Sequence, residues 1–145
     1  SGLVETATLM GNVVFGADHD VAAWIAQRVP GYVPTASTKC LAVMKDQQIA
    51  AAVAFDNWNG VHVNASIAVD RKDWISKSTM FKIFYYPFVQ LGCEAISVFV
   101  PSSNTRSIGL ATKMGFELEA IVKYAAHDGS AVMVLKMFKH KCRWI

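Results

Sequence analysis

The segment Asn104–Glu119, with the sequence NTRSIGLATKMGFELE, constrains the fold most, because it signals a helix start, a helix end and a following strand. Asn104 is a favourable N-cap, since its side-chain oxygen can accept an otherwise unpaired amide hydrogen of the first helical turn. Gly115 marks the helix end, because glycine adopts a left-handed turn at little cost. Phe116 then opens the next element. By itself this segment describes a capped helix that could belong to many α/β domains. Its predicted apolar face consists of Ile108, Leu110, Ala111 and Met114.

Apolar periodicity in the first half of the chain predicts one helix followed by three strands with tight connections, which is typical of an antiparallel meander. Asp18 or Asp20 is the expected cap of that helix, and Pro30-Gly31 is its expected end. The predicted strands are 13–15 before the helix, then Cys40–Met44, Ile49–Phe55 and Val61–Val69, with Lys45–Gln48 as a turn.

The second half predicts helix, strand, helix and two strands. Trp74–Leu91 has helical periodicity with Ser76 or Ser78 as cap, and Pro87 should kink or shorten it. A meander that continues into a βαβ crossover gives an α/β fold with a mixed sheet and helices on its faces. The predicted strands of this half are Ala95–Val100, Glu117–Lys123 and Ala131–Met137, the last two joined by the turn His127-Asp128-Gly129.

Length and composition indicate one folded domain over residues 1–145. The chain is 53% hydrophobic and 17% charged, which excludes a disordered protein. No run approaches the roughly 20 apolar residues of a membrane-spanning helix, and no signal peptide is recognisable, so we expect a cytoplasmic protein. Three widely spaced cysteines, Cys40, Cys93 and Cys142, show no metal-ligand spacing, and we expect reduced thiols and no metal site.

Residues 88–133, FVQLGCEAISVFVPSSNTRSIGLATKMGFELEAIVKYAAHDGSAVM, and the tail LKMFKHKCRWI resemble the GNAT acyltransferase superfamily. The resemblance is to its branch of ribosomal-protein N-terminal acetyltransferase-like proteins and to short phage-encoded members. It implies a mostly antiparallel, twisted sheet of about seven strands with helices on both faces. It also implies acetyl-CoA as the cofactor, a primary amine as the acceptor, and a phage origin with a host-cytoplasmic or virion location.

In this family the cofactor pyrophosphate is held where the helix after the fourth strand begins, and residues 70–79 occupy that place here. The usual Arg/Gln-x-x-Gly-x-Gly/Ala signature is absent, since no glycine occurs between Gly60 and Gly92. A solvent-exposed, capped helix start is the alternative interpretation of this segment. The cofactor-binding residues that the resemblance implies are Asn104, Arg71, Trp74, Ser76, Lys77, Ser78 and Thr79.

The resemblance also suggests a general acid. Many family members carry a tyrosine seven residues after the asparagine, but here that residue is Ala111. A serine three residues after the asparagine is thought to act instead in the N-terminal acetyltransferase branch, and Ser107 matches it. A helix cap and a surface hydroxyl are the alternative roles of Asn104 and Ser107, and Tyr124 is a weaker acid candidate that, if buried, would more often simply pack.

The family places the catalytic base on the third strand of the meander. His62 and Asn64 share one face of that strand by its two-residue period. Histidine, with an unperturbed pKa near ~6.5, suits proton removal at neutral pH. Asp56 and Asp70 flank the strand as further candidates, with turn or capping roles as their alternative. Trp58 could line an acceptor groove or pack on the sheet.

We therefore expect an acetyl-CoA-dependent N-acetyltransferase acting on a primary amine, foremost a protein lysine or N-terminus. The alternatives are a nucleobase-modifying or other small-amine transferase, and a catalytically degenerate GNAT-like binding, virion or host-inhibiting protein. A net charge of +3 without a dense basic stripe does not favour nucleic acid as a partner. The C-terminal Trp144-Ile145 either folds back onto its own chain or packs on a partner subunit in a homodimer.

Overall fold

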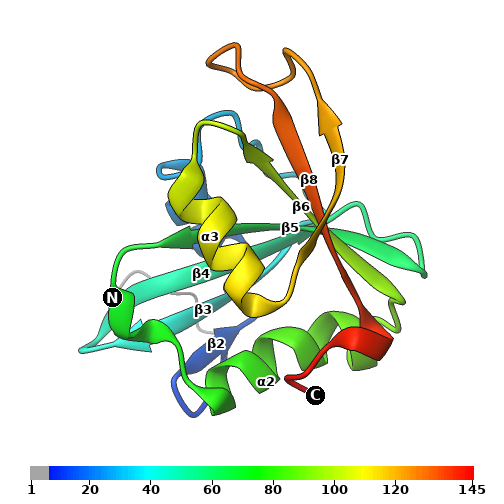
Figure 1. The fold of residues 1–145 in the computed structure, drawn as a ribbon. Coiled ribbons are helices and arrows are strands. Elements are labelled where there is room, and N and C mark those ends of the chain that lie inside the picture. The colour runs from blue at the N-terminus through cyan, green and yellow to red at the C-terminus, as the bar shows by residue number, and fades with distance from the viewer. Residues whose placement is uncertain (1–6) are drawn as a thin grey trace.

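The computed structural model describes residues 7–145, and Figure 1 shows its twisted sheet with helices packed on the face toward the viewer. Three α-helices are present in the described residues, namely α1 (Asp18–Ala26), α2 (Lys77–Tyr85) and α3 (Thr105–Met114). The strands are β1 (Thr8–Met10), β2 (Val13–Phe15), β3 (Lys39–Lys45), β4 (Gln48–Asp56), β5 (His62–Val69), β6 (Ala95–Pro101), β7 (Glu117–Val122) and β8 (Val132–Phe138).

All eight strands form one sheet in the order β1-β2-β3-β4-β5-β6-β8-β7. Only the β5–β6 pair is parallel among these strands, because the chain crosses over through α2 between them. The predicted mixed, mostly antiparallel α/β fold is confirmed. The prediction of about seven strands missed β1, which pairs with β2 through Thr8–Phe15 and Met10–Val13.

The two faces of the sheet carry separate hydrophobic clusters. One face is covered by α2 and α3 and contains the larger cluster, whereas α1 covers the β3–β4 region of the other face. Small side chains on that second face let α1 approach the sheet closely, and they include Ala42, Ala52, Ala54 and Ala68. The predicted helices on both faces are therefore confirmed.

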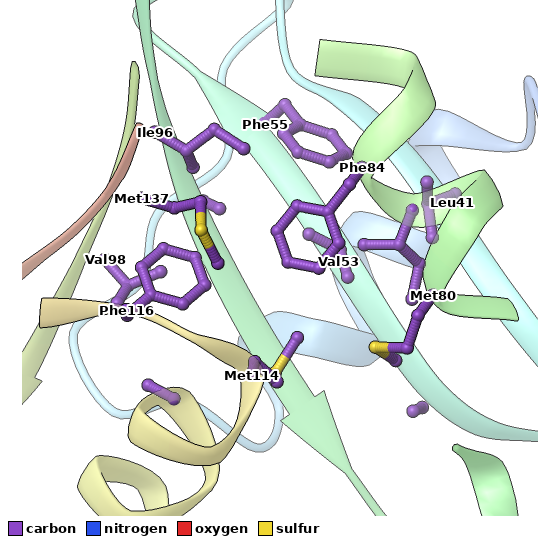
Figure 2. Packing of buried hydrophobic residues seen from close by; sticks show 14 of the residues in the cluster. Leu41, Val53, Phe55, Met80, Phe84, Ile96, Val98, Met114, Phe116 and Met137 are labelled. Carbon is purple, nitrogen blue, oxygen red and sulfur yellow. The ribbon is translucent and has the colours of Figure 1, made fainter. Parts of the chain in front are cut away.

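The larger cluster joins both covering helices to the centre of the sheet (Figure 2). Phe84 of α2 and Phe116, which follows α3, have ring centroids 6.1 Å apart. Met114 and Met137 lie beside them, each at most 2% exposed. Burying an aromatic ring of this kind is worth about 1.5–3 kcal/mol, so the cluster fixes α2 and α3 against the strands.

The N-terminus of α1 corrects the sequence prediction. Neither Asp18 nor Asp20 is the N-cap: the helix starts after Ala17, which offers no side-chain cap, and both aspartates lie in the first turn. Asp18 instead accepts the backbone N–H of Cys40 at 2.8 Å, which ties α1 to β3. An acidic side chain in the first turn also interacts favourably with the helix dipole.

The predicted helix 74–91 is divided into three parts. Trp74 ends a short 3₁₀ turn (Lys72–Trp74), and α2 begins after Ser76, whose hydroxyl accepts the Thr79 N–H at 3.1 Å. The helix ends at Tyr85, and Tyr86–Gln90 form a π-helical turn that contains Pro87. The predicted shortening at Pro87 is confirmed, because proline cannot donate the regular backbone hydrogen bond.

The caps predicted for α3 are both present. The Asn104 side chain accepts the Ser107 N–H at 3.1 Å, and Gly115 ends the helix in the left-handed region with φ of 112°. A side chain at Gly115 would be strained there and would lie 3.0 Å from the Met137 side chain. The local signals therefore set both ends of this helix.

Candidate active site

The parallel pair β5–β6 opens into a gap. Its ladder runs from His62–Ala95 to Ala65–Val98 and, within residues 7–145, has no further pair. Beyond this point β6 stays paired with β8 as far as Pro101, while β5 stays paired with β4 as far as Val69. The two strands consequently run apart, as Figure 1 shows, and the space between residues 66–69 and 99–101 is called the β5–β6 gap.

Backbone groups of β5 face this gap without a strand partner. Glu94 and Ala95 donate to the Val61 carbonyl, so odd-numbered residues of β5 direct their N–H and C=O groups toward β6. The same alternation directs the backbone of Ile67 and Val69 into the gap. Unpaired strand edges attract extended ligands that can complete the hydrogen-bond ladder, so the gap is suited to an amide-containing chain.

The two strands that border the wide end of the gap lead into two helices. Residues 70–76 lead from the end of β5 to α2, and residues 102–104 lead from the end of β6 to α3. In open α/β sheets ligands bind outside the carboxyl ends of parallel strands, and helix N-termini favour anions. The start of α3 therefore lies at the wide end of the gap, whereas the start of α2 lies farther across the sheet, since Thr79 contacts Asn12 in the turn before β2.

A cleft of about 440 Å³ lies at the first turns of α2. We call it the tail cleft, because the C-terminal residues form one wall. Lys77 and Ser78 of α2, both predicted cofactor residues, are exposed and line it, and Phe81 lies one turn further along. The opposite wall consists of Arg143 and Trp144, which the sequence analysis did not connect with this helix.

The remaining residues predicted to bind cofactor at 70–79 have partners within the protein. Arg71 forms ion pairs with Asp46 and Asp73, at 2.7 and 2.8 Å. Hydrogen bonding to those two carboxylates raises the pKa of Arg71. Trp74 is 2% exposed in the core and lines neither the gap nor the tail cleft.

Ser76 and Thr79 are engaged in the cap of α2. The Ser76 hydroxyl lies 2.9 Å from Thr79 Oγ1, in addition to its bond with the Thr79 N–H. Thr79 is fully buried and within 3.4 Å of the Asn12 side chain. These contacts describe a helix cap, and cofactor binding by the two side chains stays a prediction.

Ser107 lies half-buried in the first turn of α3, where its backbone N–H is capped by Asn104. The Ser107 hydroxyl takes no part in that cap and is available for proton donation. Ala111 is 4% exposed in the core, which leaves no polar side chain at the position where many GNAT proteins have tyrosine. Tyr124 is 88% exposed in the loop after β7, so the alternative of a buried, packing tyrosine is wrong.

His62 lies on the sheet face opposite α2 and α3. Its Nε2 is 2.6 Å from Ser97 Oγ on the neighbouring strand β6, and Ser97 is 3% exposed. Burial lowers the pKa of His62 below 6.5, and the nearby Lys136 charge lowers it further, while Glu119 opposes this effect. The imidazole is therefore neutral and able to accept a proton at neutral pH.

Polar side chains continue from His62 in a row across the sheet. Cross-strand registers align Asp56 with Asn64, Asn64 with Ser97, and Ser97 with Lys136. Lys136 forms an ion pair with Glu119 at 2.6 Å. We call this sheet surface the open face, because α1 covers only the β3–β4 side of it and Phe99 of β6 is 51% exposed there.

The aspartates that flank β5 have different surroundings. Asp56 accepts hydrogen bonds from the Tyr32 hydroxyl, at 2.8 Å, and from the Thr38 hydroxyl. These bonds fix loop 31–38 at one end of the row, and burial together with Asp56 raises the pKa of Tyr32 above its usual range. Asp70 instead forms a bidentate ion pair with Arg28, at 2.9 and 3.0 Å, and takes no part in the row of polar side chains.

Trp58 contacts the segment before β6, and the three cysteines are buried. The Trp58 ring is 55% exposed, and its Nε1 donates to the Leu91 carbonyl at 3.1 Å. All three cysteines are buried and unpaired, and burial, followed by the Asp18 and Asp56 charges, raises the pKa of Cys40 to about 12. A protonated, buried thiol is a poor nucleophile, which argues against catalysis by Cys40.

Over the described residues 7–145, no three His, Cys, Asp or Glu side chains gather as metal ligands would. The same residues contain no helix that is both long and apolar enough to cross a membrane.

Comparisons with known proteins agree with this architecture. No protein-family model matches the sequence, and no curated protein matches it in sequence. Among solved structures, the chain is similar to spermidine/spermine N-acetyltransferase SpeG from Vibrio cholerae, with 15% identity, a TM-score of 0.63 and coverage of 73% of this chain and 68% of that one.

It is also similar to N-acetyltransferase PseH from Campylobacter jejuni, with 19% identity, a TM-score of 0.55 and coverage of 72% of this chain and 70% of that one. A second PseH structure, in complex with acetyl coenzyme A, has a TM-score of 0.54 at 18% identity, over 72% of this chain and 70% of that one. At these identities the likeness concerns the fold. The protein has the GNAT fold, the fold of the N-acetyltransferases to which it is similar.

Proposed function

We propose that the protein is an acetyl-CoA-dependent N-acetyltransferase that acts on a primary amine. The observation that carries the proposal is the β5–β6 gap, which opens between the helix-covered face and the open face, with the start of α3 at its wide end and the neutral His62 at the paired end of the same two strands. In the reaction an N–C bond forms, a C–S bond breaks, and the amine loses one proton while the sulfur gains one. The chain has groups for both proton transfers.

The residues around the gap fit the cofactor. Unpaired backbone groups of Ile67 and Val69 match the amides of a pantetheine arm, and Lys77 and Ser78 offer a cation and a helix start for phosphate. When bound, acetyl-CoA supplies an electrophilic thioester carbonyl. The glycine-poor segment before α2 does not prevent this fit, because the tail cleft offers room beside the helix start.

His62 is the proposed base. Its lowered pKa keeps the imidazole neutral, and it lies half-buried on the open face, the side from which we propose that the amine approaches. Asn64, two residues along the same face, is proposed to orient the acceptor through its amide. General-base catalysis of this type contributes about 10²–10⁴-fold to the rate.

Ser107 is the proposed acid. It lies in α3, on the opposite face of the sheet from His62. His62 pairs with Ala95 at the start of β6, whereas α3 follows the end of β6, so the two residues are also separated along the strands and each would exchange protons with the reacting atoms through water. Asn104 holds the turn that carries Ser107, and we propose that it also contacts the cofactor.

The acceptor is proposed to be a lysine side chain or an N-terminus of a protein. The open face is partly apolar at Phe99, which suits a peptide segment. SpeG is named as acting on spermidine and spermine, so a small polyamine is the comparison acceptor for the same site. A phage origin and a location in the host cytoplasm stay predictions from the resemblance.

Titration calorimetry with CoA and acetyl-CoA, followed by thiol-release assays with lysine peptides and spermidine, tests the proposal. We expect saturable micromolar binding of the cofactor and thiol release that depends on the amine. Absence of binding at millimolar cofactor would contradict the proposed function. Binding without transfer to any amine would favour a GNAT-fold binding protein without catalysis.

The second candidate is a GNAT-fold binding protein without catalysis. One observation favours it: Arg71 and the caps of α2 are already satisfied by internal partners. In that case the tail cleft would bind a ligand, the protein would transfer no acetyl group, and substitution of His62 or Ser107 would leave the ligand affinity unchanged.

A further inference from the structure

We propose that the C-terminal tail completes the cofactor site, with Arg143 and Trp144 joining Lys77 to hold the phosphate-bearing nucleotide end of CoA. This inference rests on the proposed function and adds a binding segment that neither the α2 sequence nor the fold by itself contains.

The tail is fixed to the C-terminal end of α3. The Trp144 indole N–H donates to the Met114 carbonyl at 2.8 Å, and the Arg143 guanidinium donates to the Lys113 carbonyl. These are carbonyls that the end of a helix leaves without helical partners. Cys142 is 8% exposed beside them, so the tail folds back onto its own chain and one wall of the tail cleft is preorganised.

Two cations face the tail cleft without a counter-charge. Among residues 7–145, neither Lys77 nor Arg143 has a carboxylate within salt-bridge distance, whereas Lys141, close by in the tail, pairs with Glu117 at 3.5 Å. Two like charges that line one cleft repel each other, and a bound anion relieves that repulsion. The charges therefore indicate an anionic ligand.

Backbone groups at the same wall add to this preference. The Ser76 hydroxyl occupies the Thr79 N–H, which leaves the amides of Lys77 and Ser78 in the first turn without a helical acceptor. Arg143 presents several N–H donors in a planar fork, of which the Lys113 carbonyl uses one. Phosphate oxygens accept such donors in pairs, so the donors suit a phosphate.

The aromatic walls point to a nucleotide. Phe81 is 45% exposed, and the Arg143 guanidinium lies 4.3 Å from the centre of the half-buried Trp144 ring. Flat aromatic and guanidinium surfaces stack on purine rings. A volume of about 440 Å³ falls within the range typical of small-molecule sites, about 300–1,000 Å³. CoA unites an adenine with phosphates, whereas the pantetheine arm has neither.

This assignment also accounts for the absence of glycine before α2. Glycines allow a backbone to approach phosphate closely, and the chain has none between Gly60 and Gly92. Here the longer side chains of Lys77 and Arg143 reach into the cleft from two sides. Side-chain donors thereby take the place of close backbone approach.

Titration calorimetry on the full chain tests the inference with two probes, CoA and pantetheine. We expect Arg143→Gln and Lys77→Gln each to weaken CoA binding about 10- to 100-fold, the loss typical of one charge-assisted phosphate contact, and to leave pantetheine binding unchanged. Lys139→Gln is the matched control, because it removes the same charge from the tail outside the cleft, and we expect less than about a 2-fold change.

Lys77→Gln keeps the test valid if Arg143→Gln does not fold, since Lys77 makes no contact with the α3 carbonyls. Unchanged CoA affinity in a folded Lys77→Gln or Arg143→Gln protein would overturn the tail assignment while the proposed function stands. An equal loss in Lys139→Gln would also overturn it, because the effect would then follow net charge. Absence of CoA binding by the wild type would overturn both.

Discussion

His62 and Ser97 are joined by a 2.6 Å hydrogen bond between adjacent parallel strands. The register places Asn64, not His62, directly opposite Ser97, so the imidazole reaches diagonally along the sheet to the hydroxyl. This bond fixes the ring orientation, and burial keeps the ring neutral. We propose that this pair is where the proton of the acceptor amine is taken up.

Replacing His62 with glutamine tests the base directly. His62→Gln keeps a side chain able to hydrogen-bond Ser97 but cannot accept a proton near neutral pH. We expect kcat to fall about 10²-fold or more with unchanged CoA affinity, measured by thiol release and calorimetry. A variant with wild-type kcat would exclude His62 as the base.

The pH dependence of kcat/KM should report the same histidine. Lys136 lowers the pKa of His62, so Lys136→Met should raise that pKa and move the acidic limb of the profile to higher pH. The sign follows because a base works only above its pKa. Lys139→Met serves as a control of equal charge change, and an acidic limb that does not move would contradict the assignment.

Stability should also depend on His62 below neutral pH. Its pKa is lower in the folded than in the unfolded state, so the unfolded chain binds more protons between the two values. The free energy of unfolding should therefore fall as the pH decreases below about 6.5, the unfolded pKa. In His62→Gln this part of the pH dependence should disappear from urea unfolding curves.

The roles of Asn104 and Ser107 can be tested separately, although both residues belong to the first turn of α3. Asn104→Ala removes the cap of α3 and should cost about 1 kcal/mol of unfolding free energy. Ser107→Ala leaves the cap intact and should lower kcat about 10²-fold without a comparable stability loss. Chemical denaturation and steady-state kinetics on both variants provide the measurements; full activity of Ser107→Ala would remove it from the mechanism.

Trp74 should behave as a core residue. It is 2% exposed, and its truncation to alanine should destabilise the protein by about 3–5 kcal/mol. Trp74→Phe, which keeps most of the ring volume, should fold and bind CoA with wild-type affinity in calorimetry. A selective loss of CoA affinity in Trp74→Phe would instead support the cofactor contact that the resemblance implied.

Much of the fold could be predicted from local sequence signals. Asn104 and Gly115 gave both ends of α3, because capping and left-handed turns depend on the residue itself and its immediate neighbours. Pro87 gave the shortening of α2 for the same reason. In contrast, β1 was missed: a strand of three residues is stabilised mainly by its partner β2, which its own sequence does not specify.

Several side-chain roles were not predictable, because they depend on partners far away in the sequence. The predicted capping by Asp18 failed because its carboxylate instead bonds the Cys40 amide. Residues 70–79 alone do not show that Arg71 pairs with Asp46 or that Trp74 is buried in the core. Periodicity shows that His62 and Asn64 share a face of β5, but not which residues of the neighbouring strands lie beside them.

The sequence by itself determined the caps of α3, the order of strands along the chain up to one short strand, and the polar face of β5, since these follow from dihedral preferences and side-chain periodicity. Only the tertiary structure decided that β6 parts from β5 to open a gap, that Ser97 meets His62, and that Arg143 meets the helix of Lys77. The physical reason is that strand pairing and tail docking bring together groups whose separation along the chain carries no local signal.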